Sequence, residues 1–211
     1  EGHVPVDGRC TEEYLACVRE NYLRVCERVE HICASLGRTD EVKLVAASKT
    51  VPAEAVNYAA SLGLRAFGEN RVQEFCDKEP LLSPQLERHF IGSLQRNKVK
   101  YLIGRTALIH SVDSVPLAEE ISRRAQRAGY VQDILVEINI GREENKGGVM
   151  PEALDDFFDR IADFEGINPR GLMTIAPKCS EKDDYRIFFA ETYQILLDIN
   201  AKKIHNKCVP L

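Results

Sequence analysis

Residues 43–50 have the sequence KLVAASKT, an apolar run that ends at a lysine. A short apolar run followed by turn residues is typical of a strand that is buried on both faces of a parallel sheet. Thr50 can cap a following helix, and Pro52 suits the first turn of that helix, where its missing N–H costs little. We therefore expect Lys49 to leave the end of a strand and to point toward the start of a helix.

The chemistry available to Lys49 depends on its surroundings. A lysine held beside apolar side chains loses its proton readily and can attack a carbonyl carbon to form a Schiff base. A lysine at the end of a strand can equally extend its amine into solvent and have no chemical role. The stretch alone leaves both interpretations open.

The pattern of strand, turn and helix occurs six times along the chain, after a first long helix over residues 11–36 that ends at Gly37. Strands are expected over 44–47, 65–67, 89–91, 107–110, 134–140 and 171–175, and helices over 53–62, 70–78, 94–103, 115–128, 151–164 and 184–199. Strands that alternate with helices predict a parallel sheet with right-handed crossovers.

Two architectures fit this alternation, an open doubly wound sheet and a closed (β/α)8 barrel. No GxGxxG follows the first strand, which weakens the dinucleotide-binding version of the open sheet. Six units can be counted, and complete barrels need about 250 residues. We therefore predict an α/β fold, a (β/α)8 TIM-type barrel with an extra N-terminal helix that lacks its last strands, as a single domain over residues 1–211.

Composition excludes several classes of protein. The 211 residues are 44% hydrophobic and 29% charged, with a net charge of −5 and no dense Lys/Arg stripe, so we expect no nucleic-acid partner. The longest apolar stretches have the length of strands, which argues against a membrane span. Seven cysteines without a CxxC pair suggest neither a zinc site nor a disulfide framework. With no leader-like start, we expect a cytoplasmic protein, and a monomer.

Functional groups in a parallel sheet or barrel collect at the carboxyl ends of the strands. The expected strand ends carry Lys49, Gly68-Glu69-Asn70, Gly92-Ser93, His110-Ser111-Val112-Asp113, Asn139 with Lys146 in the loop beyond it, and Met173-Thr174. Each group has a structural alternative, since glycines permit turns, serines cap helices and histidines in apolar runs are usually core residues. No elbow motif accompanies the serines, so a hydrolase triad has little support.

Taken together, these blocks resemble a known family. They are VAASKT (45–50), FGENRVQE (67–74), HFIGSLQRNK (89–98), HSVDS (110–114), NIG (139–141), ENKGG (144–148) and GLMTI (171–175). In order and spacing, from about residue 43 to residue 177, they are similar to the pyridoxal phosphate homeostasis proteins. Arg71 stands where the family usually has tyrosine, and Ser93 where it has histidine.

This resemblance implies a barrel akin to the N-terminal domain of alanine racemase, with pyridoxal 5′-phosphate (PLP) held as a Schiff base on Lys49. Asn70 and Met173 match positions near the cofactor ring, and Asn139 is a further candidate. Lys146 matches a loop lysine that could pass the cofactor in or out. The family continues beyond the position of Leu211 with strand ends that hold the phosphate, so we expect weaker PLP binding than in a chain extended through them.

Three functions fit these residues. The first, implied by the resemblance, is a non-enzymatic carrier that buffers PLP and delivers it to apo-enzymes. The second is a PLP-dependent amino-acid racemase, which would need a second acid/base group opposite Lys49. The third is a Schiff-base aldolase without a cofactor, which a barrel with one lysine would allow. The sequence favours the carrier, because no tyrosine stands at an expected strand end.

Overall fold

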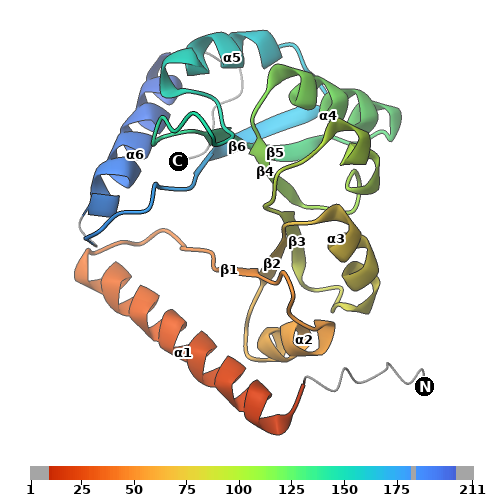
Figure 1. Ribbon diagram of the computed structural model, residues 1–211, viewed down its shortest axis with the longest axis vertical. Helices are drawn as coiled ribbons and strands as arrows, with labels where there is room; N and C mark the ends of the chain where they lie inside the picture. Colours follow the sequence, from red (N-terminus) through yellow and green to blue (C-terminus); the bar gives the residue numbers. More distant parts are fainter. Residues whose placement is uncertain (1–9, 182–183, 203–211) are drawn as a thin grey trace. The chain divides into compact units, whose positions relative to one another are not determined.

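The protein is described here by a computed structural model that covers residues 10–181 and 184–202 (Figure 1). Its helices are α1 (Glu12–Ser35), α2 (Ala53–Ser61), α3 (Val72–Lys78), α4 (Val115–Arg127), α5 (Leu154–Ile161) and α6 (Asp184–Lys202). Its strands are β1 (Val45–Ala47), β2 (Ala66–Glu69), β3 (Glu87–Phe90), β4 (Leu108–Val112), β5 (Gln132–Ile138) and β6 (Ile167–Thr174). Short 3₁₀ helices are η1 (Glu79–Leu81), η2 (Arg96–Tyr101) and η3 (Pro151–Ala153).

The predicted alternation of strands and helices is confirmed. The strand order is β1-β2-β3-β4-β5-β6, and the pairs β1–β2, β4–β5 and β5–β6 are parallel. Six strands are fewer than the eight of a complete barrel, and the barrel is not closed within the described residues. The chain divides into two compact units, an N-terminal unit of residues 1–89 and a C-terminal unit of residues 90–211. The expected single domain over 1–211 stays a prediction.

The core of the N-terminal unit lies between β1–β2 and the helices α2 and α3. Strand β2 is buried along its whole length, and Phe67 and Phe75 are fully buried. Ala47 pairs with Gly68, and the N–H of Ser48 continues the ladder by donating to the carbonyl oxygen of Gly68 at 3.0 Å. The ladder thus extends to the residue before Lys49, which fixes where the strand ends.

Helix α1 forms where its 3.6-residue period predicts it, and it contacts α2 within the N-terminal unit (Figure 1). Its first turn is capped by Thr11, whose hydroxyl accepts a hydrogen bond from the Tyr14 N–H at 3.2 Å. None of its residues is buried, and Val25 and Ile32 keep nearly half of their surface. The apolar face that the sequence predicts is therefore only partly covered.

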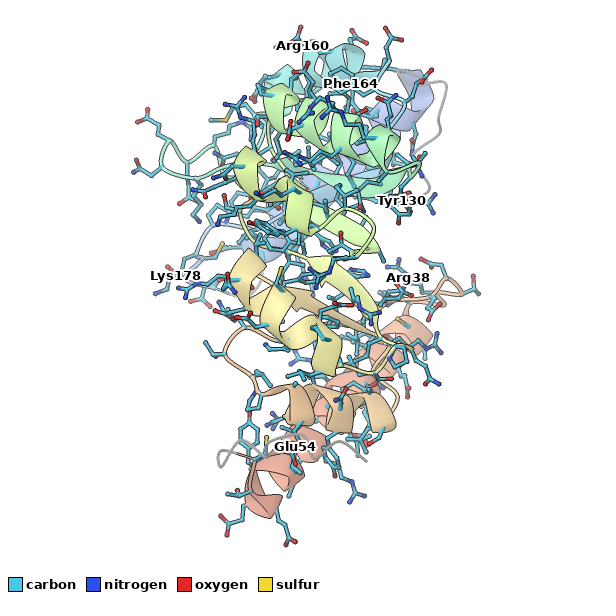
Figure 2. The ribbon with its side chains drawn as sticks, turned by 90° about the vertical axis from the view of Figure 1, so that its right-hand side faces the viewer. Arg38, Glu54, Tyr130, Arg160, Phe164 and Lys178 are labelled. Atoms are coloured by element: carbon cyan, nitrogen blue, oxygen red, sulfur yellow. The ribbon has the colours of Figure 1, made fainter. Side chains whose placement is uncertain are left out.

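In the C-terminal unit, α4 packs against β5 and β6, and α5 packs against α4. Strand β5 alternates strictly between buried and half-buried residues, and its buried side includes Ile134 and Val136. Ile121 of α4 and Phe158 of α5 are fully buried, whereas Arg160 of α5 lies on the outside of the unit (Figure 2). Within the described ranges, no helix has both the length and the apolar character that a membrane span requires.

Several expected boundaries differ from the structure, including those of the helix over 94–103 and of the last strand. The helix expected over 94–103 is the 3₁₀ helix η2, which is shorter. The last strand begins at Ile167 rather than at 171. Pro169 lies in the added part, next to a shift in the β5–β6 register where Ile134 pairs with Pro169 and Leu135 pairs with Gly171. A proline has no N–H to donate to the ladder, so it is tolerated only at such an irregularity. The sequence around Pro169 therefore lacks the pattern of a regular strand.

Gly148 is a position in the C-terminal unit where both the backbone conformation and the surrounding atoms disfavour a side chain. Its φ is +106°, and a Cβ added there would lie 2.6 Å from the backbone nitrogen of Asn139. We expect Gly148→Ala to lower the free energy of unfolding by more than the about 1–2 kcal/mol that a left-handed backbone alone costs an L-residue. Urea unfolding followed by circular dichroism measures this loss.

Gly129→Ala is the matched control, because Gly129 also has a positive φ, +64°, but nothing lies within 4 Å of its added Cβ. Gly129→Ala should lower the free energy of unfolding only by the cost of the left-handed backbone. Equal destabilisation by the two substitutions would contradict the close approach of Gly148 to the end of β5.

Candidate functional site

The candidate residues fall into two groups, one in each unit. Lys49 and Asn70 belong to the N-terminal unit, and Asn139, Lys146 and Met173 belong to the C-terminal unit. Within each unit they stand at or just beyond the carboxyl ends of strands, as the alternation predicts.

Lys49 follows the last residues of the β1 ladder. Ala47 is exposed, Ser48 is buried and Lys49 is exposed again, so the two-residue alternation of the strand continues through the lysine. The structure gives the Lys49 amine no hydrogen bond and no ion pair with any described residue. Lys49 therefore presents a free primary amine on the face of the strand opposite to buried Ser48.

The turn after Lys49 is strained. Thr50 has φ +63°, a conformation that β-branched residues rarely adopt. Its N–H donates to Oε2 of Glu74 at 3.4 Å, and the N–H of Val51 closes the turn onto the carbonyl oxygen of Ser48 at 3.0 Å. The expectation that Thr50 caps the next helix is wrong, because Pro52 occupies the N-cap position of α2. Strained residues of this kind cluster at functional sites.

Asn70 follows directly after β2. Parallel pairing of Ala47 with Gly68 brings the carboxyl ends of β1 and β2 to the same edge of the sheet, so Lys49 and Asn70 stand at neighbouring strand ends. The side-chain oxygen of Asn70 is buried and has no hydrogen-bond partner among the described residues. A buried acceptor without a donor costs free energy, so this oxygen is a candidate for a hydrogen bond from a bound ligand.

Asn139 organises the loop that follows β5. Its side-chain nitrogen donates to the carbonyl oxygens of Glu143 at 2.8 Å and Lys146 at 3.3 Å, and its side-chain oxygen accepts from the Glu143 N–H at 3.1 Å. Its own N–H donates to the carbonyl oxygen of Val149 at 3.0 Å. The carboxamide of Asn139 is thus engaged by its own loop, and its predicted contact with a cofactor stays a prediction.

Lys146 lies in this loop with a partly exposed side chain. Its amine forms an ion pair of 2.7 Å with Oε2 of Glu143. Both side chains keep about 40% of their surface, so solvent screens the pair and it contributes little stability. The amine can leave Glu143 at low cost and remain available to an anion.

Met173 lies on β6 directly opposite Glu137 of β5 and is half-buried. Burial, together with the nearby negative charge of Asp113, raises the pKa of the Glu137 carboxyl. A Cβ built on Gly147 would lie 3.5 Å from Oδ2 of Asp113, so the Lys146 loop runs beside the end of β4. Two carboxyl groups, a thioether and a glycine turn therefore gather at this end of the C-terminal unit.

Sequence reasoning missed Lys78 and Glu137, and it placed Glu69 at a strand end without identifying its burial or its partner. Glu69 is fully buried at the end of β2, Lys78 at the end of α3 pairs with it, and Glu137 is half-buried in β5. A signal existed for Glu69 and Glu137, since Glu69 is the single acid of β2 and Glu137 stands between two apolar residues of β5. No local signal identifies Lys78, because its partner lies on another element.

Comparison with known proteins identifies the family of the chain. The alanine racemase N-terminal domain family matches residues 19–209. The pyridoxal phosphate homeostasis protein of Aquifex aeolicus is 46% identical over 178 residues, which are 83% of this chain and 78% of that protein.

Solved structures extend the similarity to three dimensions. The structure of PipY from Synechococcus elongatus with PLP bound matches with a TM-score of 0.72 and 28% identity over 84% of each chain. Alanine racemase of Clostridium difficile matches with a TM-score of 0.69 over 94% of this chain and 50% of that one, at 14% identity, which shows a shared fold alone. With a family match over most of its length and a relative at 46% identity, the chain belongs to the pyridoxal phosphate homeostasis proteins, within the alanine racemase N-terminal domain family.

Proposed function

We propose that this protein binds PLP covalently through Lys49 and acts as a PLP carrier in cofactor homeostasis rather than as a catalyst. The observation that carries the proposal is the free Lys49 amine beside the unsatisfied Asn70 oxygen, at neighbouring strand ends of the N-terminal unit. Relatives named for PLP homeostasis, and the PLP-bound structure of PipY, support the same cofactor.

The residues of the N-terminal unit fit the chemistry of PLP. PLP is an aldehyde, and the aldehyde condenses with a primary amine to form a C=N bond. Lys49 supplies an exposed amine that no acidic residue among the described ones neutralises. Asn70 supplies a buried acceptor without a donor, which a hydroxyl group on the cofactor ring would satisfy.

The C-terminal unit contains the three other candidate residues for PLP binding. Met173 offers a polarizable side chain that suits an aromatic ring, and Asn139 holds the loop that carries Lys146. Lys146 offers a cation whose present partner is weakly held, which suits transient contact with a phosphate. We assign these three residues to PLP binding and transfer on the strength of their family positions.

A carrier role agrees with the placement of the tyrosines better than a racemase role does. Racemisation needs acid/base groups on both faces of the substrate carbon. All seven tyrosines of the chain are described, and each lies on a helix or in the turn after α4 rather than at the end of a strand. We propose that PLP passes from this protein, as a monomer, to apo-enzymes that depend on it. The free cysteines of the described part support the cytoplasm as its location.

Lys49→Ala should abolish the visible absorbance band that forms when PLP is added, because the amine that condenses with the aldehyde is gone. Residual non-covalent binding should be weaker by at least about tenfold, or about 1.4 kcal/mol. Titration with PLP, followed by absorbance, measures both effects.

Lys43→Ala is the matched control. Lys43 precedes the same strand at its other end, and its amine pairs with Glu87 at 2.8 Å. This variant should keep the band. Persistence of the band in Lys49→Ala, or its loss in Lys43→Ala, would contradict the assignment of Lys49.

The PLP-loaded protein should not accelerate exchange of the α-proton of L-alanine in deuterated water beyond the rate with free PLP. The physical reason is the lack of a second acid/base group among the tyrosines. Nuclear magnetic resonance of the alanine measures the exchange. Faster exchange that disappears in Lys49→Ala would favour a racemase.

Lys146→Ala should slow both uptake and release of PLP by several-fold while leaving the band at saturation intact. The loop lysine contributes a charge that attracts the phosphate, but it does not form the C=N bond. Stopped-flow absorbance gives the rates. Arg142→Ala is the control, because this loop cation is held by Glu152 at 2.7 Å and Glu191 at 2.9 Å. Unchanged rates in Lys146→Ala would remove Lys146 from the proposal.

A further inference from the structure

A cluster of three side chains lies immediately behind Lys49 on the buried face of β1–β2. Ser48 is 2% exposed and Glu69 is 0% exposed. The Ser48 hydroxyl donates to Oε1 of Glu69 at 2.6 Å, and the Lys78 amine, which comes from the end of α3, forms an ion pair with the same oxygen. We call these residues the Ser48 cluster.

Every polar group of Ser48, the residue before Lys49, has a hydrogen-bond partner. The Ser48 N–H donates to the Gly68 carbonyl at 3.0 Å, and its hydroxyl donates to Glu69. Its carbonyl oxygen accepts two hydrogen bonds, from the Lys78 amine at 2.7 Å and from the Val51 N–H at 3.0 Å. The peptide group that leads into Lys49 is therefore held by β2, α3 and its own turn.

Stability alone is a poor explanation for this cluster. Desolvation of a buried Lys–Glu pair offsets most of its attraction, and apolar replacements of similar volume are often neutral or stabilising. The second carboxylate oxygen of Glu69 is buried and has no hydrogen-bond partner in the part of the chain that the structure describes, which adds a further cost. Thr50, two residues after Ser48, is held at φ +63°, which requires the surrounding contacts to fix the turn.

We propose that Glu69 and Lys78 are positioning residues, which hold the backbone of Ser48 so that the Lys49 amine is presented in one orientation to the PLP aldehyde. The proposal rests on the proposed function of Lys49. Neither residue contacts the cofactor in this account. Each acts through Ser48, from the face of the strand opposite to Lys49.

The test replaces the pair by side chains of similar volume, in the variant Glu69→Met/Lys78→Met. The variant should unfold in urea near the midpoint of the unaltered protein, because both charges leave the interior together. Formation of the PLP band should be slower by at least about tenfold, since small misplacements of a reacting group reduce rates strongly. Labelling of Lys49 by an amine-acylating reagent should be unchanged, because its exposure does not depend on the pair.

The control variant is Lys43→Met/Glu87→Met, which removes a Lys–Glu pair of the same unit that lies away from Ser48. It should form the band at the unaltered rate. If the unaltered protein forms no Lys49 band, the proposed function itself fails. If the unaltered protein forms it and Glu69→Met/Lys78→Met forms it equally fast, the function stands and the positioning role is overturned.

Ser48→Ala tests the positioning role if the variant Glu69→Met/Lys78→Met does not fold. This substitution removes the hydroxyl that joins Ser48 to Glu69 and leaves the buried ion pair in place. The band should then form several-fold more slowly in a protein of nearly unaltered stability. A rate equal to that of the unaltered protein would overturn the role of the cluster.

Discussion

Parallel pairing of β1 with β2 is the constraint on which the candidate site depends. Parallel strands end at the same edge of a sheet, so the register of Ala47 with Gly68 brings Lys49 and Asn70 to adjacent positions. The same register places Ser48 against Glu69 on the other face. This one pairing therefore places Lys49 on the exposed face of β1 and the contact between Ser48 and Glu69 on its buried face.

Lys49 and Lys78, which lie on opposite sides of β1, have opposite environments. Lys78 is nearly buried, with a carboxylate and a carbonyl oxygen as acceptors, and its amine is committed to these bonds. Lys49 is exposed and has no partner among the described residues. Because a primary amine reacts with an aldehyde only when it is accessible and unpaired, we propose that PLP reacts with Lys49 and not with Lys78.

Local pattern was enough to predict the strands, their parallel order and the place of Lys49 at the end of β1, because apolar runs and turn residues carry that information. It failed where long-range contacts decide the conformation. Thr50 was expected to cap α2, but the contacts of the turn hold it in a left-handed conformation. The first half of β6 was not predicted, because it contains Pro169 and a proline is not typical of a strand interior. Lys78 could not be found, because its role arises only when α3 folds back onto β2.

The most direct test of the account is to locate the covalent bond. The protein is mixed with PLP, reduced with borohydride, digested and analysed by mass spectrometry. We expect one modified peptide, with the reduced cofactor on Lys49. Modification of Lys78 or Lys146 instead, or an even distribution over the exposed lysines, would contradict it.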